Sequence, residues 1–298
     1  MPELAEVEIA ARNLRRWALG RTLVELEGAR GAGYVFRPAG AARLARALEG
    51  ARFTHVDRHG KQLMLTLERD AEGPCCRGGA PMSLAQRGGG RRAPRETGLL
   101  AHLGMTGKWL RRKASEEPPR FSRARLELDD GHALHFVDQR LFGRLRLVPE
   151  ARFDAVPELE ALGPDPLKDG IDVPRLAGLL ARSRLPVKVR LMDQAILPGV
   201  GNIVASESCF RARVSPRRRS ASLARGEVEA IAGAILDTVQ DAIARQEGPE
   251  LQYVEEGGEN PFLVYDRAGE RCPRCKRGKI ERFVQAQRAT FHCPRCQK

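Results

Sequence analysis

The sequence predicts an α+β fold: an antiparallel β-sandwich with a flanking N-terminal helix, then a helical domain, then a C-terminal β-hairpin held by a metal ion. Three observations predict it. Short runs that alternate apolar and charged residues fill positions 21–150, helical periodicity begins near Pro157, and the chain ends in two pairs of cysteines. We therefore expect domains at 1–150, 158–256 and 257–298.

The composition favours a polyanionic partner. The 298 residues include 51 Lys and Arg against 38 Asp and Glu, which gives a net charge of +13 and a pI near 10.0. No apolar run approaches the roughly 18 residues that span a bilayer, so we expect no membrane partner. The first ten residues hold three glutamates and no basic residue, so no leader is expected and the protein should be cytosolic, in the bacterial cytosol or nucleoid.

The first residues predict an amphipathic helix with Pro2 at its start, where a missing N–H costs nothing. The residues spaced to share one face are Leu4, Val7, Ala11, Leu14 and Trp17. Removal of Met1, usual before a small residue, would make Pro2 a secondary amine beside the carboxylate of Glu3. These residues alone fit two interpretations, a good helix start and an amine nucleophile.

An insert interrupts the strands at residues 73–98. Of its 26 residues, 15 are Gly, Pro or Arg, so it cannot bury enough apolar area to order itself. It predicts a flexible basic loop between two strands. Further along, Asp130-Gly131 predicts the turn of a hairpin.

The C-terminal cysteines have the spacing of a zinc site. Cys272-x2-Cys275 is followed after seventeen residues by Cys293-x2-Cys296, which matches the four-thiolate pattern. Four sulfurs close the coordination shell, so one structural Zn²⁺ is predicted, with no open position for chemistry. The hairpin carries basic residues suited to a phosphate backbone, which are Lys276, Arg277, Lys279, Arg282 and Arg288.

A glycine turn lies between two helical segments. Gly199 and Gly201 allow a tight turn, the following helix directs N–H groups at an anion, and Asn202 adds a side-chain donor. This predicts a contact with DNA phosphate; an ordinary helix–helix turn is the alternative. The run "LPGVG" also resembles the hairpin of helix-hairpin-helix glycosylases of the endonuclease III type.

Taken in order, six features resemble the formamidopyrimidine-DNA glycosylase and endonuclease VIII family of bifunctional base-excision repair enzymes. They are Pro2-Glu3, "RHGKQL" on a strand, "HLGMTG", "DQRLFG", "LMDQAILPGVGNIVASE" and the four-cysteine finger. The resemblance covers the chain except 73–98. It implies an N-terminal β-sandwich, a helix–two-turn–helix domain and a zinc finger, with double-stranded DNA in the cleft between and one structural zinc. The protein is expected to act as a monomer.

The resemblance implies three catalytic residues. Pro2 matches the nucleophile, Glu3 the catalytic carboxylate, and Lys61 the strand lysine that contacts the phosphate near the lesion. An α-amine has a pKa of about 8 in model peptides, and the positive end of a helix favours its neutral, nucleophilic form. Glu6 matches a further acidic position, with a structural or supporting role.

Six DNA-contacting residues follow from the same resemblance. His102, Asn202 and Arg288 match residues that bind flanking phosphates. Met105, Arg140 and Phe142 match the side chains that fill the gap left by an extruded base, which otherwise costs a few kcal/mol.

The expected activity is that of a bifunctional glycosylase and abasic-site lyase, which excises oxidised bases through a Schiff base at Pro2 with β,δ-elimination. A non-catalytic DNA-damage-binding zinc-finger protein is the alternative. Ala5 stands where the family has proline, and Val204 where it has tyrosine. The segment before the finger is shorter than the loop that closes over 8-oxoguanine in the purine-specific branch, so the preferred lesion stays open.

Overall fold

The computed structural model describes residues 2–69, 95–246, 248 and 260–298, which form two compact units. We call Met1–Ala11, Arg58–Gln62 and Pro157–Lys298 the helical unit, and Arg12–Asp57 with Leu63–Val156 the sandwich unit. Helix α1 (Leu4–Ala18) belongs to the helical unit at its start and to the sandwich unit at its end. No helix among the described residues is long and apolar enough to cross a membrane.

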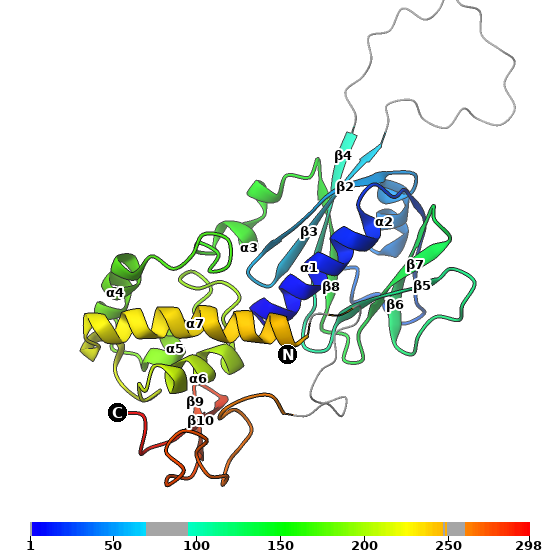
Figure 1. Cartoon of the computed structure of the whole chain (residues 1–298). Helices are drawn as coiled ribbons and strands as arrows, with labels where there is room; N and C mark the ends of the chain where they lie inside the picture. The colour runs from blue at the N-terminus through cyan, green and yellow to red at the C-terminus, as the bar shows by residue number, and fades with distance from the viewer. Residues whose placement is uncertain (1, 70–94, 247, 249–259) are drawn as a thin grey trace, which may run out of the picture. The chain divides into compact units, whose positions relative to one another are not determined.

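The sandwich unit contains two four-stranded sheets, ordered β1-β6-β7-β5 and β2-β3-β4-β8, with helix α2 (Ala41–Leu48) (Figure 1). The strands are β1 (Leu23–Gly28), β2 (Arg52–His59), β3 (Gln62–Arg69), β4 (Arg95–His102), β5 (Lys108–Lys113), β6 (Ser122–Leu128), β7 (His132–Val137) and β8 (Arg144–Pro149). Antiparallel pairing of β1 with β6, β6 with β7, β5 with β7 and β4 with β8 agrees with the predicted architecture.

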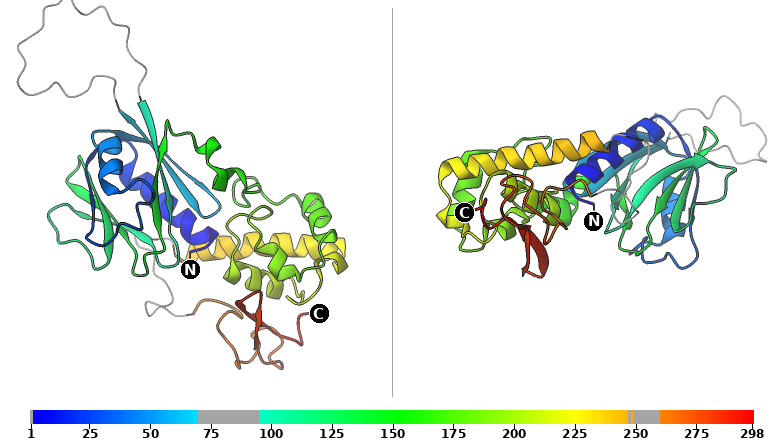
Figure 2. Two further views of the ribbon diagram at one scale, coloured as in Figure 1. Left: turned by 180° about the vertical axis from the view of Figure 1, so that it is seen from behind. Right: turned by 60° about the horizontal axis from the view of Figure 1, so that its bottom comes forward.

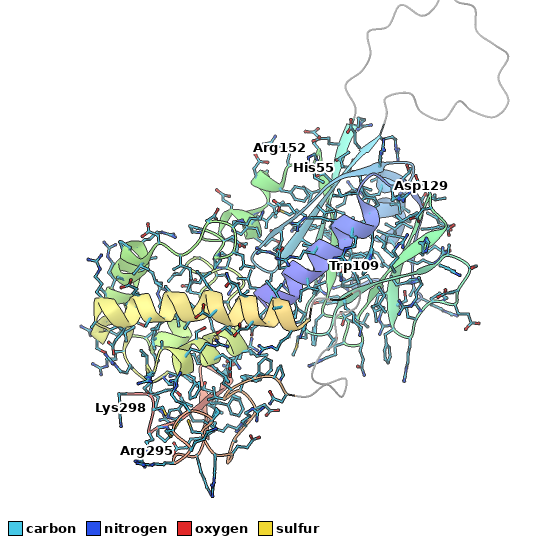
Figure 3. The ribbon with its side chains drawn as sticks, in the orientation of Figure 1. His55, Trp109, Asp129, Arg152, Arg295 and Lys298 are labelled. Carbon is cyan, nitrogen blue, oxygen red and sulfur yellow. The ribbon has the colours of Figure 1, made fainter. Side chains whose placement is uncertain are left out.

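The core of the sandwich unit follows the alternation in the sequence. Leu126 and Leu134 face each other across β6 and β7, and both are fully buried. Trp109 pairs with Phe136 across β5 and β7, with ring centroids 5.2 Å apart; Figure 3 labels Trp109 in this unit. The predicted hairpin turn is present, with Gly131 in the left-handed region at φ 74°.

The insert is shorter than the sequence predicts at its C-terminal end. Strand β4 begins at Arg95, so residues 95–98 of the predicted loop lie in a strand. Pairing explains the difference, because Gly98 opposes Val148 of β8 and a Cβ there would lie 2.7 Å from the ring of Phe153. Residues 73–94 lie outside the described part of the chain.

The helical unit is built around α7 (Arg225–Arg245), the long helix seen in both views of Figure 2. The other elements are the short α3 (Pro157–Glu160), α4 (Val173–Ala181), α5 (Val187–Leu191), α6 (Asn202–Arg211) and the 3-10 turn η3 (Ser220–Ser222); a second 3-10 turn, η2 (Phe153–Ala155), lies in the sandwich unit. Helix α6 is buried along nearly its whole length, so its ends are fixed by contacts within this unit.

The finger ends the helical unit. Strands β9 (Glu281–Gln285) and β10 (Arg288–His292) pair antiparallel around a turn in which Ala286 and Gln287 have positive φ. Its small core joins Phe291 and Ile280 to Phe210 of α6. Figure 3 labels Arg295 and Lys298 at this end of the chain.

The predicted amphipathic face of α1 is confirmed. The five residues Leu4, Val7, Ala11, Leu14 and Trp17 are all buried, at 0% to 9% exposure. Helix formation begins after Pro2-Glu3, which leaves these two residues in an extended lead-in to the helix.

Candidate active site

The carboxylate of Glu3 lies at the N-terminus of α6. Its Oε1 accepts a hydrogen bond from the N–H of Ile203 and its Oε2 accepts one from the N–H of Val204, both at 2.9 Å. The first N–H groups of a helix have no partner within the helix and favour an anion. The sequence predicts a DNA phosphate as that anion; the structure corrects this, since the chain's own Glu3 occupies the position.

The two glycines of the turn allow this close approach. Leu4 donates its N–H to the carbonyl of Gly199 at 3.0 Å, and a Cβ on Gly199 would lie 2.6 Å from Leu4 Cδ1. A Cβ on Gly201 would overlap the carboxylate of Glu3. Gln194 holds the turn from inside, because its Oε1 accepts from Gly199 N and its Nε2 donates to Val200 O, both at 2.9 Å.

Pro2 is buried immediately before Glu3. While Met1 precedes it, its nitrogen belongs to a peptide bond, so chemistry at that atom requires removal of Met1. Glu6 Oε2 accepts the N–H of Glu3 at 2.9 Å, which fixes the backbone of the lead-in. Burial raises the pKa of Glu6, partly offset by that hydrogen bond.

Lys61 lies in the turn between β2 and β3, which corrects the prediction that it lies on a strand. Gly60 allows the turn because it adopts φ 56°, in the left-handed region that favours glycine. The carboxylate of Asp165 fixes the turn. It accepts a hydrogen bond from the N–H of Gly60 at 2.7 Å and two more from the guanidinium of buried Arg58. A Cβ on Gly60 would lie 2.8 Å from Pro198 Cβ, so the Lys61 turn packs on the segment that contacts Leu4.

Asn202 is buried at the first position of α6, and its side chain connects to the finger. Its Nδ2 donates to Ala289 O at 2.9 Å, while its Oδ1 accepts from Lys188 Nζ at 2.6 Å. Lys188 Nζ also donates to Thr290 Oγ1 at 2.8 Å. Burial lowers the pKa of Lys188 to about 8. The neighbouring Arg288, at the start of β10, is exposed, as a phosphate contact requires.

A pocket at the start of α6 is lined by the carboxylates of Glu3, Glu6 and Glu207 and by two arginines, Arg211 and Arg245. Glu207 is buried and anchors the segment before the finger by accepting backbone N–H bonds at 2.8 to 2.9 Å from Leu263, Val264 and Tyr265. Glu207 is a functional residue that the sequence does not predict. Its only signal is an acidic residue in the middle of a predicted helix, which does not reveal its partners.

In the sandwich unit, Asp138 organises the loop that carries Arg140 and Phe142. Its carboxylate accepts the N–H of Gly143 at 2.7 Å, the N–H of Arg140 at 3.1 Å and the hydroxyl of Thr106 at 2.6 Å. Phe142 remains 45% exposed, with the Arg140 guanidinium 5.0 Å from its ring centroid. An exposed aromatic on a fixed loop suits insertion into a base stack.

The other two predicted DNA contacts of this unit, His102 and Met105, lie at the end of β4 and in the turn that follows it. Met105 sits in the turn after Gly104, and a Cβ on Gly104 would lie 2.5 Å from the backbone of Phe142. The structure therefore brings Met105 next to the loop of Arg140 and Phe142. His102, at the end of β4, accepts the N–H of Gly104 through Nδ1 at 3.0 Å.

The four cysteines of the finger converge. Their sulfurs lie within 4.8 Å of one another, with Cys272 Sγ 3.7 Å from Cys296 Sγ and Cys275 Sγ 3.9 Å from Cys293 Sγ. A tetrahedron with Zn–S bonds of about 2.3 Å has S···S edges of about 3.8 Å, so the sulfurs fit zinc. Cys209 is buried elsewhere, and burial raises the pKa of its thiol to about 12.

Comparison with known proteins matches three consecutive regions to family models. Residues 1–145 match the formamidopyrimidine-DNA glycosylase N-terminal domain, residues 162–252 the formamidopyrimidine-DNA glycosylase H2TH domain, and residues 269–298 the zinc finger found in FPG and IleRS. With the sulfur geometry, the last match identifies the four cysteines as the ligands of one structural zinc.

Known proteins match this chain over nearly its whole length. The formamidopyrimidine-DNA glycosylase of Rhodospirillum centenum is 36% identical, with all of both chains covered, and that of Thermus thermophilus is 35% identical over 97% of this chain and 96% of its own. The crystal structure of MutM (Fpg) from Thermus thermophilus superposes with a TM-score of 0.75 at 34% identity, covering 99% of this chain and 98% of that one. Lactococcus lactis Fpg in complex with abasic-site DNA, at 22% identity and a TM-score of 0.81 over 99% of both chains, shares the fold. The chain belongs to the formamidopyrimidine-DNA glycosylase family of DNA-repair enzymes.

Proposed function

We propose that Pro2, once Met1 is removed, is the nucleophile of a DNA glycosylase and abasic-site lyase. The observation that carries this proposal is the binding of Glu3 to the first turn of α6, which fixes residue 2 beside a carboxylate at a glycine turn. Because Glu3 is fixed, the Pro2 nitrogen next to it in the chain is held in a defined position, as a reaction at one sugar carbon requires.

The reaction proceeds through an imine. The Pro2 nitrogen forms a bond to C1′ of the deoxyribose, the glycosidic bond breaks, and the base leaves with a proton. Opening of the sugar ring gives an iminium. Loss of a C2′ proton expels the 3′ phosphate by β-elimination, and a second elimination expels the 5′ phosphate. Water then hydrolyses the imine and frees the amine.

Glu3 and Lys61 would serve these steps differently. Each Glu3 oxygen accepts one backbone N–H and keeps a second lone pair, so the carboxyl group can carry a proton and pass it to O4′ as the sugar ring opens. Lys61 projects from a turn held by Gly60 and Asp165, and would bind the phosphate next to the lesion. The zinc, held by the four cysteines, would shape the finger that presents Arg288.

The substrate is double-stranded DNA with an oxidised base or an abasic site. His102, Asn202 and Arg288 would bind or position flanking phosphates, and Met105, Arg140 and Phe142 would fill the gap in the stack. The three family-model matches support the division into domains at 1–150, 158–256 and 257–298. We place the enzyme in the cytosol as a monomer.

Borohydride trapping on abasic-site DNA tests the nucleophile. The same chain is prepared with Met1 retained and after treatment with methionine aminopeptidase, so that the two samples differ only at the terminal nitrogen. Borohydride reduces the iminium to a stable amine and leaves protein covalently attached to DNA. We expect a trapped complex from the processed protein alone. Equal trapping by both samples would show that the Pro2 nitrogen is not required and overturn the assignment.

A further inference from the structure

The sandwich unit carries a cluster of one aromatic ring and two guanidinium groups that the proposed reaction does not use. Tyr34 is 42% exposed. The guanidinium carbon of Arg144 lies 3.5 Å from the centroid of its ring, and that of Arg37 lies 5.0 Å away. We call Tyr34, Arg37 and Arg144 the Tyr34 cluster. Stacking on an aromatic ring fixes a guanidinium in place while its N–H edge stays available.

The Tyr34 cluster is attached to the loop of Phe142. Arg144 Nη1 donates to the carbonyls of Gly143 at 2.8 Å and Phe142 at 3.2 Å. The backbone continues the connection, because Leu145 N donates to Val35 O at 2.8 Å. A ligand that places a base stack at Phe142 must therefore pass close to Arg144.

The cluster carries uncompensated positive charge. Among the described residues, Arg37, Arg140 and Arg144 make no ion pair with a carboxylate, and Arg144 uses only Nη1 for its backbone hydrogen bonds. The nearest acid of the loop, Asp138, is fully buried and already accepts from Thr106, Arg140 and Gly143. Guanidinium groups without carboxylates, exposed at Arg37 and half-buried at Arg144, favour an anionic partner.

The geometry points to a DNA phosphate, and we infer that the Tyr34 cluster is a subsite for the DNA backbone beside the loop that carries Arg140 and Phe142. A base is the wrong ligand, since Arg144 lies over the ring face that a base would stack on. A phosphate instead accepts from guanidinium edges and requires no sequence. The inference rests on the proposed function, because it takes the DNA duplex bound at Phe142 as the ligand.

Salt dependence of DNA binding tests the subsite. Dissociation constants are measured across a salt series for two duplexes, one undamaged and one with a tetrahydrofuran abasic-site analogue. Each phosphate neutralised contributes about 0.9 to the slope of log K against log salt. We expect Arg37→Ala to lower the slope by about 1 on both duplexes. Tyr34→Ala should lower it on both as well, while Tyr34→Phe keeps the ring and should bind as the wild type does.

Arg16→Ala is the matched control, because Arg16 is an exposed arginine of the same unit on α1 and its loss changes the net charge equally. Its slope should equal that of the wild type. If Arg37→Ala and Arg16→Ala give the same slope, or if Arg37→Ala weakens binding to the abasic duplex alone, the inference is overturned. Borohydride trapping by the processed wild type is scored separately, so failure of the proposed chemistry and failure of this subsite are distinguishable.

Discussion

Glu3 and Val204, 201 residues apart in the chain, are joined by a hydrogen bond of 2.9 Å from the Val204 N–H to the Glu3 carboxylate. A second hydrogen bond comes from the N–H of Ile203, so each oxygen of Glu3 accepts one N–H from the first turn of α6. The helix end that could bind a phosphate is therefore used to fix the start of the chain. In the proposed function, phosphate affinity comes instead from side chains such as Lys61 and Arg288.

Gly201→Ala should disrupt this arrangement. The added methyl group would overlap the Glu3 carboxylate, which cannot withdraw without leaving two N–H groups of α6 unpaired. We expect the free energy of unfolding to fall by about 1–3 kcal/mol and borohydride trapping to be largely lost. Urea unfolding and trapping by processed protein measure the two effects.

Gly233→Ala provides the control for that substitution. Gly233 lies within α7, and an added Cβ would meet nothing within 4 Å. Alanine in a helix interior is more stable than glycine by roughly 0.5–1 kcal/mol. This variant should therefore unfold at a higher urea concentration and give the same yield of borohydride-trapped complex as the wild type. An equal loss of trapping in both variants would show that Gly201 has no special relation to Glu3.

Local patterns predicted the elements well and their long-range partners poorly. The face of α1, the Asp130-Gly131 hairpin and the cysteine pairs follow from spacing along the chain. That Glu3 fills the N-terminus of α6 does not, because the same glycine turn suits a phosphate and a carboxylate equally. The β2–β3 turn shows the same limit: Asp165, which holds Gly60, lies 105 residues away and belongs to no local motif.

Removal of zinc should dissolve the finger selectively. The core of the finger is small and includes Phe291, Ile280 and two of the cysteines. Without the free energy of metal binding, this core is too small to keep the finger folded. We expect one zinc per chain. Cys293→Ser should lose this zinc together with the phosphate contact proposed for Arg288, which would lower the salt slope of DNA binding by about 1. Metal analysis and binding titrations measure this. Cys209→Ala, outside the cluster, should retain its zinc; loss of zinc there too would contradict the assignment.

Lys188 should make stability depend on pH in the alkaline range. Burial lowers its pKa from 10.5 to about 8, so between these values the unfolded chain holds a proton that the folded protein has released. The unfolding free energy of the wild type should therefore rise with pH across this window, by about 3 kcal/mol at most, and be flat below it. Lys188→Met lacks the group and should lack this rise.

The comparison with Lys188→Met is made by urea unfolding on both sides of pH 8. At neutral pH the variant relieves a buried charge but leaves Asn202 Oδ1 without its donor, so its own stability is the net of two opposed effects. The difference between the two proteins across the window isolates the titration. Parallel pH curves for both would show that Lys188 keeps its ordinary pKa.

Polar residues that are wholly or partly buried are the part of the site that sequence reasoning misses. Gln194, Glu207 and Asp138 hold the glycine turn, the segment before the finger and the loop of Phe142 respectively. Each is a polar residue in a stretch whose pattern is explained without it. Only the fold supplies the backbone N–H groups that it accepts.

Asp138→Asn should loosen the loop that carries Phe142 without removing any DNA contact. An amide nitrogen in place of Oδ1 would face the N–H of Arg140, and one in place of Oδ2 would face the N–H of Gly143, so in either orientation a donor meets a donor. We expect excision from a duplex that contains an oxidised base to slow by about 100-fold, the cost of a displaced group, while the salt slope on undamaged DNA is unchanged. Single-turnover excision and binding titrations measure the two quantities.

Asp129→Asn is the control. Asp129 lies at an exposed position near the hairpin turn of the same unit, so the substitution removes one charge without touching the loop, and the excision rate should equal that of the wild type. Because both variants lose one negative charge, a slowdown shared by the two would trace to electrostatics, and a slowdown confined to Asp138→Asn would trace to the placement of Phe142.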